Sequence, residues 1–167
     1  MDARRSSEPA VKNATTVQRK SDRELVVTRT INGPARLVFE AFRRADLFQQ
    51  WWVPKSFGMT VQSCELDVRT GGTYRLVFQV GENQSMAFFG RYLEVTPPTR
   101  IVWTNDEGEG EGAVTTATFE ESNGRTVVTL HDLHPSKAAL DEAIESGATG
   151  AYPEQFEQLE ILMTTLG

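Results

Sequence analysis

Apolar residues at the end of the chain recur at the spacing of an α-helix. They lie four, three, four and three positions apart, at Tyr152, Phe156, Leu159, Met163 and Leu166. A helix has about 3.6 residues per turn, so these side chains share one face. The other face is polar and comprises Gln155, Glu157, Gln158 and Glu160. Pro153 suits the first turn, where its missing N–H is harmless. The pattern predicts a C-terminal helix that must cover another surface.

The middle of the chain has the two-residue period of β-strands. The alternation is clearest at 73–80, where one face carries Tyr74, Leu76, Phe78 and Val80. Strands are predicted at 24–31, 60–68, 73–80, 85–95, 100–105, 113–121 and 125–133. Short helices at about 34–45 and 47–52 follow the first strand, and a further helix begins near residue 136. Runs of strands with separate helices predict an α+β fold, in which the C-terminal helix lies across a curved antiparallel sheet.

The first 22 residues lack such a pattern and are rich in Ser, Thr, Lys, Arg and Asn. They cannot bury enough apolar surface to offset the entropy of ordering, so a disordered tail is predicted over 1–22 and one domain over 23–167. Residues 1–23 hold six Lys or Arg and three Asp or Glu, so the overall charge of −6 leaves −9 on the rest. An acidic body argues against nucleic-acid binding. No apolar run approaches the roughly 18 residues of a membrane span.

Motifs for metal, cofactor or nucleophilic chemistry are missing from the sequence. Cys64 is the only cysteine, which fits a cytoplasmic location and favours a small apolar strand residue over a nucleophile. There is no Walker loop, Rossmann glycine pattern, His-Glu-x-x-His or nucleophile elbow. Gly108 lies among glutamates that would repel phosphate. His131 and His134 straddle a strand end, and a metal site would need a third ligand, for which Asp132 is only an adjacent candidate. The sequence therefore predicts no metal, no cofactor and no catalytic residue.

Several short motifs, in this order, resemble one family. They are Pro34–Arg36–Val38-Phe39–Ala41-Phe42, Leu47–Trp51-Trp52–Pro54, Gly71-Gly72-Thr73-Tyr74, Gly90–Tyr92-Leu93-Glu94-Val95–Pro97-Pro98–Arg100-Ile101-Val102, Phe119 with Thr126–Val128–Leu130-His131, and Gly147–Gly150–Glu154–Phe156–Leu159. Over about 24–166 the chain resembles the family named after the activator of the heat-shock-protein-90 ATPase, within the START-like (SRPBCC) helix-grip superfamily. The resemblance implies a curved antiparallel sheet of six or seven strands wrapped around the long C-terminal helix, with two short helices after the first strand. Pro153 departs from the family pattern and is expected to delay or kink the start of the long helix.

The resemblance also implies a cavity between the sheet and the C-terminal helix that takes an apolar ligand. The residues expected to line it are Trp51, Trp52, Tyr74, Phe78, Tyr92, Trp103, Phe119, His131, Phe156, Leu159 and Met163. Adjacent helical positions point about 100° apart, so we expect one of the two tryptophans in the core and the other further outward. A filled core needs the same inward apolar alternation as a hollow one, so the sequence leaves both open. We expect the opening of the cavity near the N-terminal end of the long helix.

Three functions remain open at this point. The first is binding of an apolar or aromatic small molecule, lipid or polyketide-like, by a monomer or weak dimer. The second is a stress-response module that contacts a chaperone, for which an exposed patch around Trp51-Trp52 is expected. The third is a cyclase or hydrolase of polyketides, which needs a polar pair inside the cavity; His131 with Tyr92 or Glu94 is the candidate.

Overall fold

The structure, a computed structural model, describes residues 14–108, 110 and 112–166. The described strands are β1 (Thr16–Arg19), β2 (Glu24–Asn32), β3 (Thr60–Leu66), β4 (Thr73–Val80), β5 (Gln84–Thr96), β6 (Arg100–Thr104), β7 (Val114–Ser122) and β8 (Arg125–Leu133). The α-helices are α1 (Ala35–Arg43), α2 (Ala45–Trp51), α3 (Lys137–Glu145) and α4 (Tyr152–Leu166). Short 3-10 turns, η1 (Lys55–Phe57) and η2 (Ala148–Ala151), precede β3 and α4.

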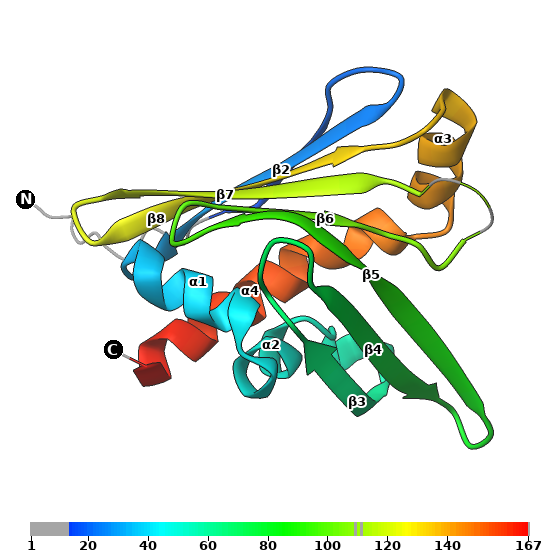
Figure 1. Ribbon diagram of the computed structural model, residues 1–167, viewed down its shortest axis with the longest axis horizontal. Helices are drawn as coiled ribbons and strands as arrows, with labels where there is room; N and C mark the ends of the chain where they lie inside the picture. The colour runs from blue at the N-terminus through cyan, green and yellow to red at the C-terminus, as the bar shows by residue number, and fades with distance from the viewer. Residues whose placement is uncertain (1–13, 109, 111, 167) are drawn as a thin grey trace, which may run out of the picture.

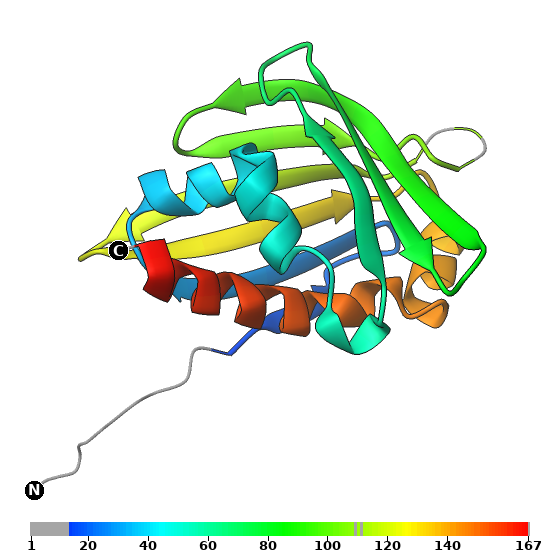
Figure 2. The same cartoon turned by 90° about the horizontal axis from the view of Figure 1, so that it is seen from below.

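All described strands join one antiparallel sheet in the order β1-β2-β8-β7-β6-β5-β4-β3. Figure 1 shows α1, α2 and α4 below the sheet, with β3, β4 and β5 bending down on the same side. Viewed from below, α4 runs across the concave face (Figure 2). The predicted helix-grip architecture is confirmed. The bounds of the strands at 73–80 and 125–133 agree with the prediction at both ends.

The described residues form a sheet of eight strands, one more than the upper end of the expected six or seven, and the additional strand is β1. This strand lies inside the segment 1–22 that composition marked as disordered. Backbone pairing explains the difference: Thr16 to Arg19 align antiparallel with Thr28 to Leu25 of β2. All four residues of β1 are exposed, so the strand is held by its ladder and carries no alternation that a sequence pattern could reveal. Residues 1–13 lie outside the described part of the chain.

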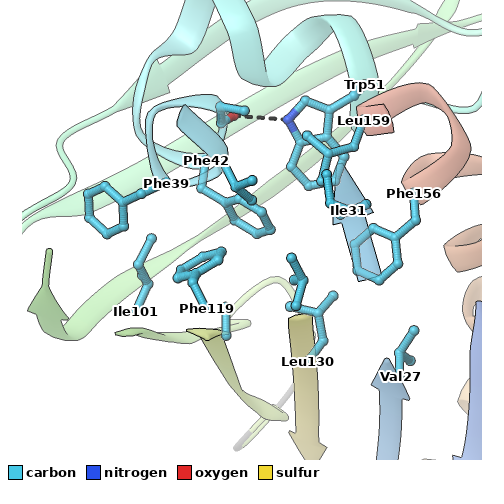
Figure 3. Close-up of a cluster of buried hydrophobic side chains, with 14 of the residues drawn as sticks. Val27, Ile31, Phe39, Phe42, Trp51, Ile101, Phe119, Leu130, Phe156 and Leu159 are labelled. Atoms are coloured by element: carbon cyan, nitrogen blue, oxygen red, sulfur yellow. Dashed lines mark hydrogen bonds between the residues drawn. The ribbon is translucent and has the colours of Figure 1, made fainter. Parts of the chain in front are cut away.

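Alternation places apolar side chains of the central strands on the helix-covered face. In β8 the inward positions are buried and the outward ones are partly exposed. Below β2, β7 and β8 the space is filled, as Figure 3 shows. There Phe119 of β7 meets Phe39 and Phe42 of α1, with ring centroids 5.8 and 5.0 Å apart. Trp51 of α2 is fully buried, and its indole N–H donates to the Ala41 carbonyl at 2.9 Å, the dashed line in Figure 3. This packed half fixes α1, α2 and α4 on the sheet.

Helix α4 begins at Tyr152 with Pro153 in its first turn, so the expected delay or kink at Pro153 is not seen. The expected polar face of α4 is only partly solvent-facing. Gln155 and Gln158 are buried. Glu160 forms an ion pair at 2.5 Å with Arg29, a buried arginine on the inner face of β2. These polar groups are buried because partners from distant segments satisfy them.

Candidate ligand-binding cavity

A cavity of about 260 Å³ lies on the concave side of β3 to β6. We call it the apolar cavity, because most of its wall is aromatic or aliphatic. Its lining comprises Phe42, Phe48, Trp52, Val53, Pro54, Phe57, Met59, Leu66, Tyr74, Leu76, Phe78, Phe88, Tyr92, Ile101, Trp103, Asn105, Glu107, Ala151, Tyr152 and Gln155. From α4 it takes only the first residues of the helix. The sheet thus grips the helix in one half of the molecule and leaves a space in the other.

Five of the residues expected at the cavity line it. They are Trp52, Tyr74, Phe78, Tyr92 and Trp103. The prediction for the tryptophan pair is also correct. Trp51 is fully buried, whereas Trp52 is partly exposed and reaches the cavity wall.

Five other expected residues pack elsewhere. The structure places Trp51, Phe119, Phe156, Leu159 and Met163 in the packed half, each at most 4% exposed and none in the cavity lining. The reason is the position of α4. Its middle and C-terminal turns lie against β2, α1 and α2, so the apolar stripe covers a filled core and only its first turn reaches the space.

His131 lies on the opposite side of the sheet from the cavity. Its ring Nε2 is 3.1 Å from a carboxylate oxygen of Glu24 on the adjacent strand β2, and both side chains are about one third exposed. The polar pair considered for an enzyme is therefore not assembled. Glu94 is also occupied elsewhere, because it forms an ion pair with Arg100 at 3.2 Å on the surface. The inward face of β8 carries the neighbouring Asp132 instead.

The wall formed by residues after α2 is held by polar side chains of α4. The Gln158 amide donates to the carbonyls of Trp51 and Val53 at 3.0 and 2.9 Å, and its oxygen accepts from the Lys55 N–H at 2.9 Å. The Gln155 amide donates to the Trp52 carbonyl at 2.5 Å. These bonds satisfy a loop whose backbone groups have no strand partner. They keep Trp52 and the following residues over the N-terminal end of α4, where we expected the opening.

One end of the cavity is polar, and the sequence interpretation did not identify it. The Tyr74 hydroxyl donates to the Thr104 carbonyl at 2.7 Å. Nearby, the Asp132 carboxylate accepts from the Thr115 hydroxyl at 2.6 Å and from the Tyr152 hydroxyl at 2.7 Å. Burial, followed by the Asp132 carboxylate, raises the pKa of Tyr152 well above its usual value, so the phenol stays protonated and donates.

Asn105, Glu107 and Tyr152 line both this end and a neighbouring cleft of about 530 Å³, which we call the polar cleft. The polar cleft also contains Asp132 and His134. A sequence signal existed for Glu107, because it lies in an acidic loop directly after a predicted strand. No pattern in the sequence showed that this loop closes the end of a cavity.

Nucleophile and metal chemistry gain no support from the described residues. Burial raises the pKa of the Cys64 thiol to about 11, which keeps it protonated at neutral pH. No group of three or more His, Cys, Asp or Glu side chains within 14–108, 110 and 112–166 is arranged to hold a metal ion. Among the same residues, no helix has the length and apolar character that crossing a membrane requires.

Comparisons with known proteins place this geometry in context. A family model described as Activator of Hsp90 ATPase homolog 1-like protein matches residues 32–164. A crystal structure from Rhodobacter sphaeroides aligns with a TM-score of 0.83 at 18% identity, covering 92% of this chain and 99% of that one. An NMR structure from Staphylococcus epidermidis aligns at 0.76 and 26% identity, covering 91% and 95%. The AHSA1-like protein from Aeromonas hydrophila aligns at 0.65 and 17% identity, covering 81% and 92%. A comparison with curated proteins found no match.

Proposed function

The chain belongs to the family of Activator of Hsp90 ATPase homolog 1-like proteins, and we propose that it binds a compact apolar or aromatic small molecule in the apolar cavity. The observation that carries this proposal is the contrast between the filled half below β2, β7 and β8 and the open space below β3 to β6. Tyr74, Tyr92 and Trp103 turn aromatic surface toward that space. Apolar surface around an unfilled space is costly unless a ligand covers it.

The size and lining of the cavity favour one of the expected ligand types. Its volume of about 260 Å³ lies just below the range of roughly 300–1,000 Å³ typical of small-molecule sites. A compact polycyclic compound of the polyketide type therefore fits better than a long-chain lipid. Rings on the wall, such as Tyr74 and Tyr92 with centroids 5.6 Å apart, offer tilted and edge contacts to a planar ligand.

The three tryptophan indole N–H signals provide a test with an internal control. Flavonoids, polyketides and fatty acids are titrated in turn, and a compound that enters the cavity should shift the indole signals of Trp52 and Trp103 in a ¹H–¹⁵N spectrum, because both line the cavity. The indole of Trp51 is bonded to the Ala41 carbonyl inside the core and should move little. If no compound shifts Trp52 and Trp103, the binding proposal fails.

A blocked variant and a matched control complete the test. Leu66→Trp places a larger side chain in the cavity wall, whereas Leu93→Trp makes the same change at an exposed position of β5. The first variant should lose binding and the second should keep it. Equal binding by both variants would place the ligand elsewhere.

The chaperone-contacting alternative and the cytoplasmic location stay predictions. The chaperone alternative expected an exposed patch around Trp51-Trp52. Trp51 is fully buried and cannot belong to such a patch. A pull-down with the middle domain of the chaperone tests it independently of the ligand titration.

A further inference from the structure

The apolar cavity has an uneven distribution of charge that bears on its ligand. Among the described residues that line it, Glu107 alone is charged. The carboxylate follows β6 and lies at the polar end, beside Asn105 and Tyr152. Burial, with a smaller contribution from Asp106, raises the pKa of Glu107, although backbone N–H groups of Phe89 and Glu107 oppose the shift. Glu107 is exposed at this end of the cavity, and backbone N–H groups lie near its carboxylate.

Cations do not compensate this carboxylate. Neither the apolar cavity nor the polar cleft has a lysine or arginine among the described residues that line it. The lining of the polar cleft also includes the acidic residues Asp132 and Glu142. Among its described residues, His134 is the one basic group. Arg91, on the adjacent strand β5, pairs with Asp106 at 3.2 Å. An anion in either space would meet like charge without a counter-ion, which disfavours it strongly.

Three other polar side chains at this end, those of Tyr74, Asn105 and Asp132, are already engaged. The Tyr74 hydroxyl donates to Thr104, and the Asn105 amide donates to the Ala113 carbonyl at 2.8 Å. Both oxygens of Asp132 accept hydroxyl donors from Thr115 and Tyr152. Among the described residues, no hydrogen bond or ion pair joins Glu107 to another side chain, so its carboxylate is an acceptor that a ligand can use, and it is the one that carries a negative charge in the apolar cavity.

Aromatic rings next to Glu107 favour the same ligand chemistry. Tyr74 lines the cavity together with Glu107, and burial, followed by the Glu107 carboxylate, raises the pKa of its phenol. Tyr92 and Trp103 continue the wall. The faces of such rings carry partial negative charge and attract a cation. A carboxylate beside aromatic faces is therefore a suitable environment for an ammonium group attached to an apolar body.

We propose that the cavity selects polycyclic or aromatic amines, with the apolar body among the rings of the apolar cavity and the amino group on Glu107, facing the polar cleft. This inference rests on the proposed function and names its ligand class. It excludes fatty acids and other carboxylates as the natural occupants.

The test uses three probes with the same ring system: 2-naphthylmethylamine, 2-naphthoic acid and 2-naphthylmethanol. Calorimetry at pH 7 should give the amine an affinity about tenfold above that of the acid, because the Glu107 carboxylate attracts the ammonium group and repels the carboxylate. The alcohol should lie between them. Glu107→Gln should remove the preference for the amine, whereas Glu65→Gln, at an exposed position of β3, should keep it.

The outcomes separate the two proposals. If the three probes bind equally, or if Glu107→Gln leaves the preference unchanged, the amine selectivity is overturned while the binding function stands. If the amine binds without shifting the indole signals of Trp52 and Trp103, it occupies another site and the selectivity is likewise overturned. If none of the probes binds, the selectivity fails, and the wider titration described above then decides the binding function.

Discussion

The two halves of the space under the sheet are lined by the same kinds of residues, but one half is a filled core and the other is a cavity. Below β2, β7 and β8, the side chains of α1, α2 and α4 fill the concave face, and Phe119, Phe156 and Leu159 are at most 2% exposed. Below β3 to β6, similarly inward side chains such as Phe78 and Tyr92 surround a space of about 260 Å³. What differs is the coverage by helices, because α4 begins at the border of the second half and runs under the first half. An inward aromatic residue is therefore core or cavity wall according to the position of a distant helix.

The largest expected effect distinguishes two phenylalanines, one in each half. Phe119 is 2% exposed and packs on Phe39 and Phe42, whereas Phe78 is 4% exposed and lines the cavity. Phe119→Ala should lower the free energy of unfolding by about 3–5 kcal/mol, the usual cost of a buried phenylalanine. Phe78→Ala should cost roughly half of that, because one side of its ring borders the cavity and packs on no other side chain there. Urea unfolding of both variants measures the difference.

The effect on ligand affinity should be larger for Phe78→Ala than for Phe119→Ala, which is the opposite of their effect on stability. Phe78→Ala removes part of the cavity wall and should weaken binding of the naphthyl probes. Phe119→Ala should leave their affinity unchanged at temperatures where the variant is folded. Equal costs in unfolding would contradict the comparison, since they would mean that the space below β3 to β6 is filled in solution.

A smaller effect concerns the border between the halves. Gln158 is buried and bonds three backbone groups of the segment 51–55. Gln158→Ala leaves these groups without partners and should lower the free energy of unfolding by about 1–3 kcal/mol. Amide hydrogen exchange at Lys55 should become faster. Glu157→Ala, on the exposed side of the same helix, is the control and should change neither quantity. Unchanged exchange at Lys55 would show that α4 does not hold this wall.

The features of this fold that the sequence predicts depend on neighbouring residues, and the features that it does not predict depend on residues far apart in the chain. Alternation is local, so the strands at 73–80 and 125–133 were predicted to the residue. The division into core and cavity was not predicted, because Phe119 and Phe78 have the same period and the same apolar character. Burial of Gln155 and Gln158 was missed as well, since their partners lie about a hundred positions earlier in the chain. Strand β1 was missed because four exposed residues leave no pattern.

The polar cleft predicts a pH dependence of stability. Burial, with a smaller effect of Arg19, lowers the pKa of His134, which the Asp132 carboxylate only partly offsets. The unfolded imidazole, with its pKa near 6.5, then takes up a proton at a higher pH than the folded one. Stability from this group is complete above about pH 6.5 and is lost as the pH falls toward the lowered folded pKa. Urea unfolding at several pH values should show this slope in the wild type and a weaker one in His134→Asn. An unchanged slope would refute the prediction.

The smallest expected effect concerns His131, which the sequence placed in the cavity and the structure places on the outer face. If the comparison of the two halves is right, the face of the sheet decides whether a residue can meet the ligand. His131→Ala should then change the affinity for the naphthyl probes by less than about twofold, as expected for an exposed pair with Glu24. Trp103→Ala, in the cavity wall, should weaken binding clearly in the same calorimetric assay. A loss with His131→Ala as large as that with Trp103→Ala would mean that the ligand reaches the outer face, and the hollow half would no longer explain binding.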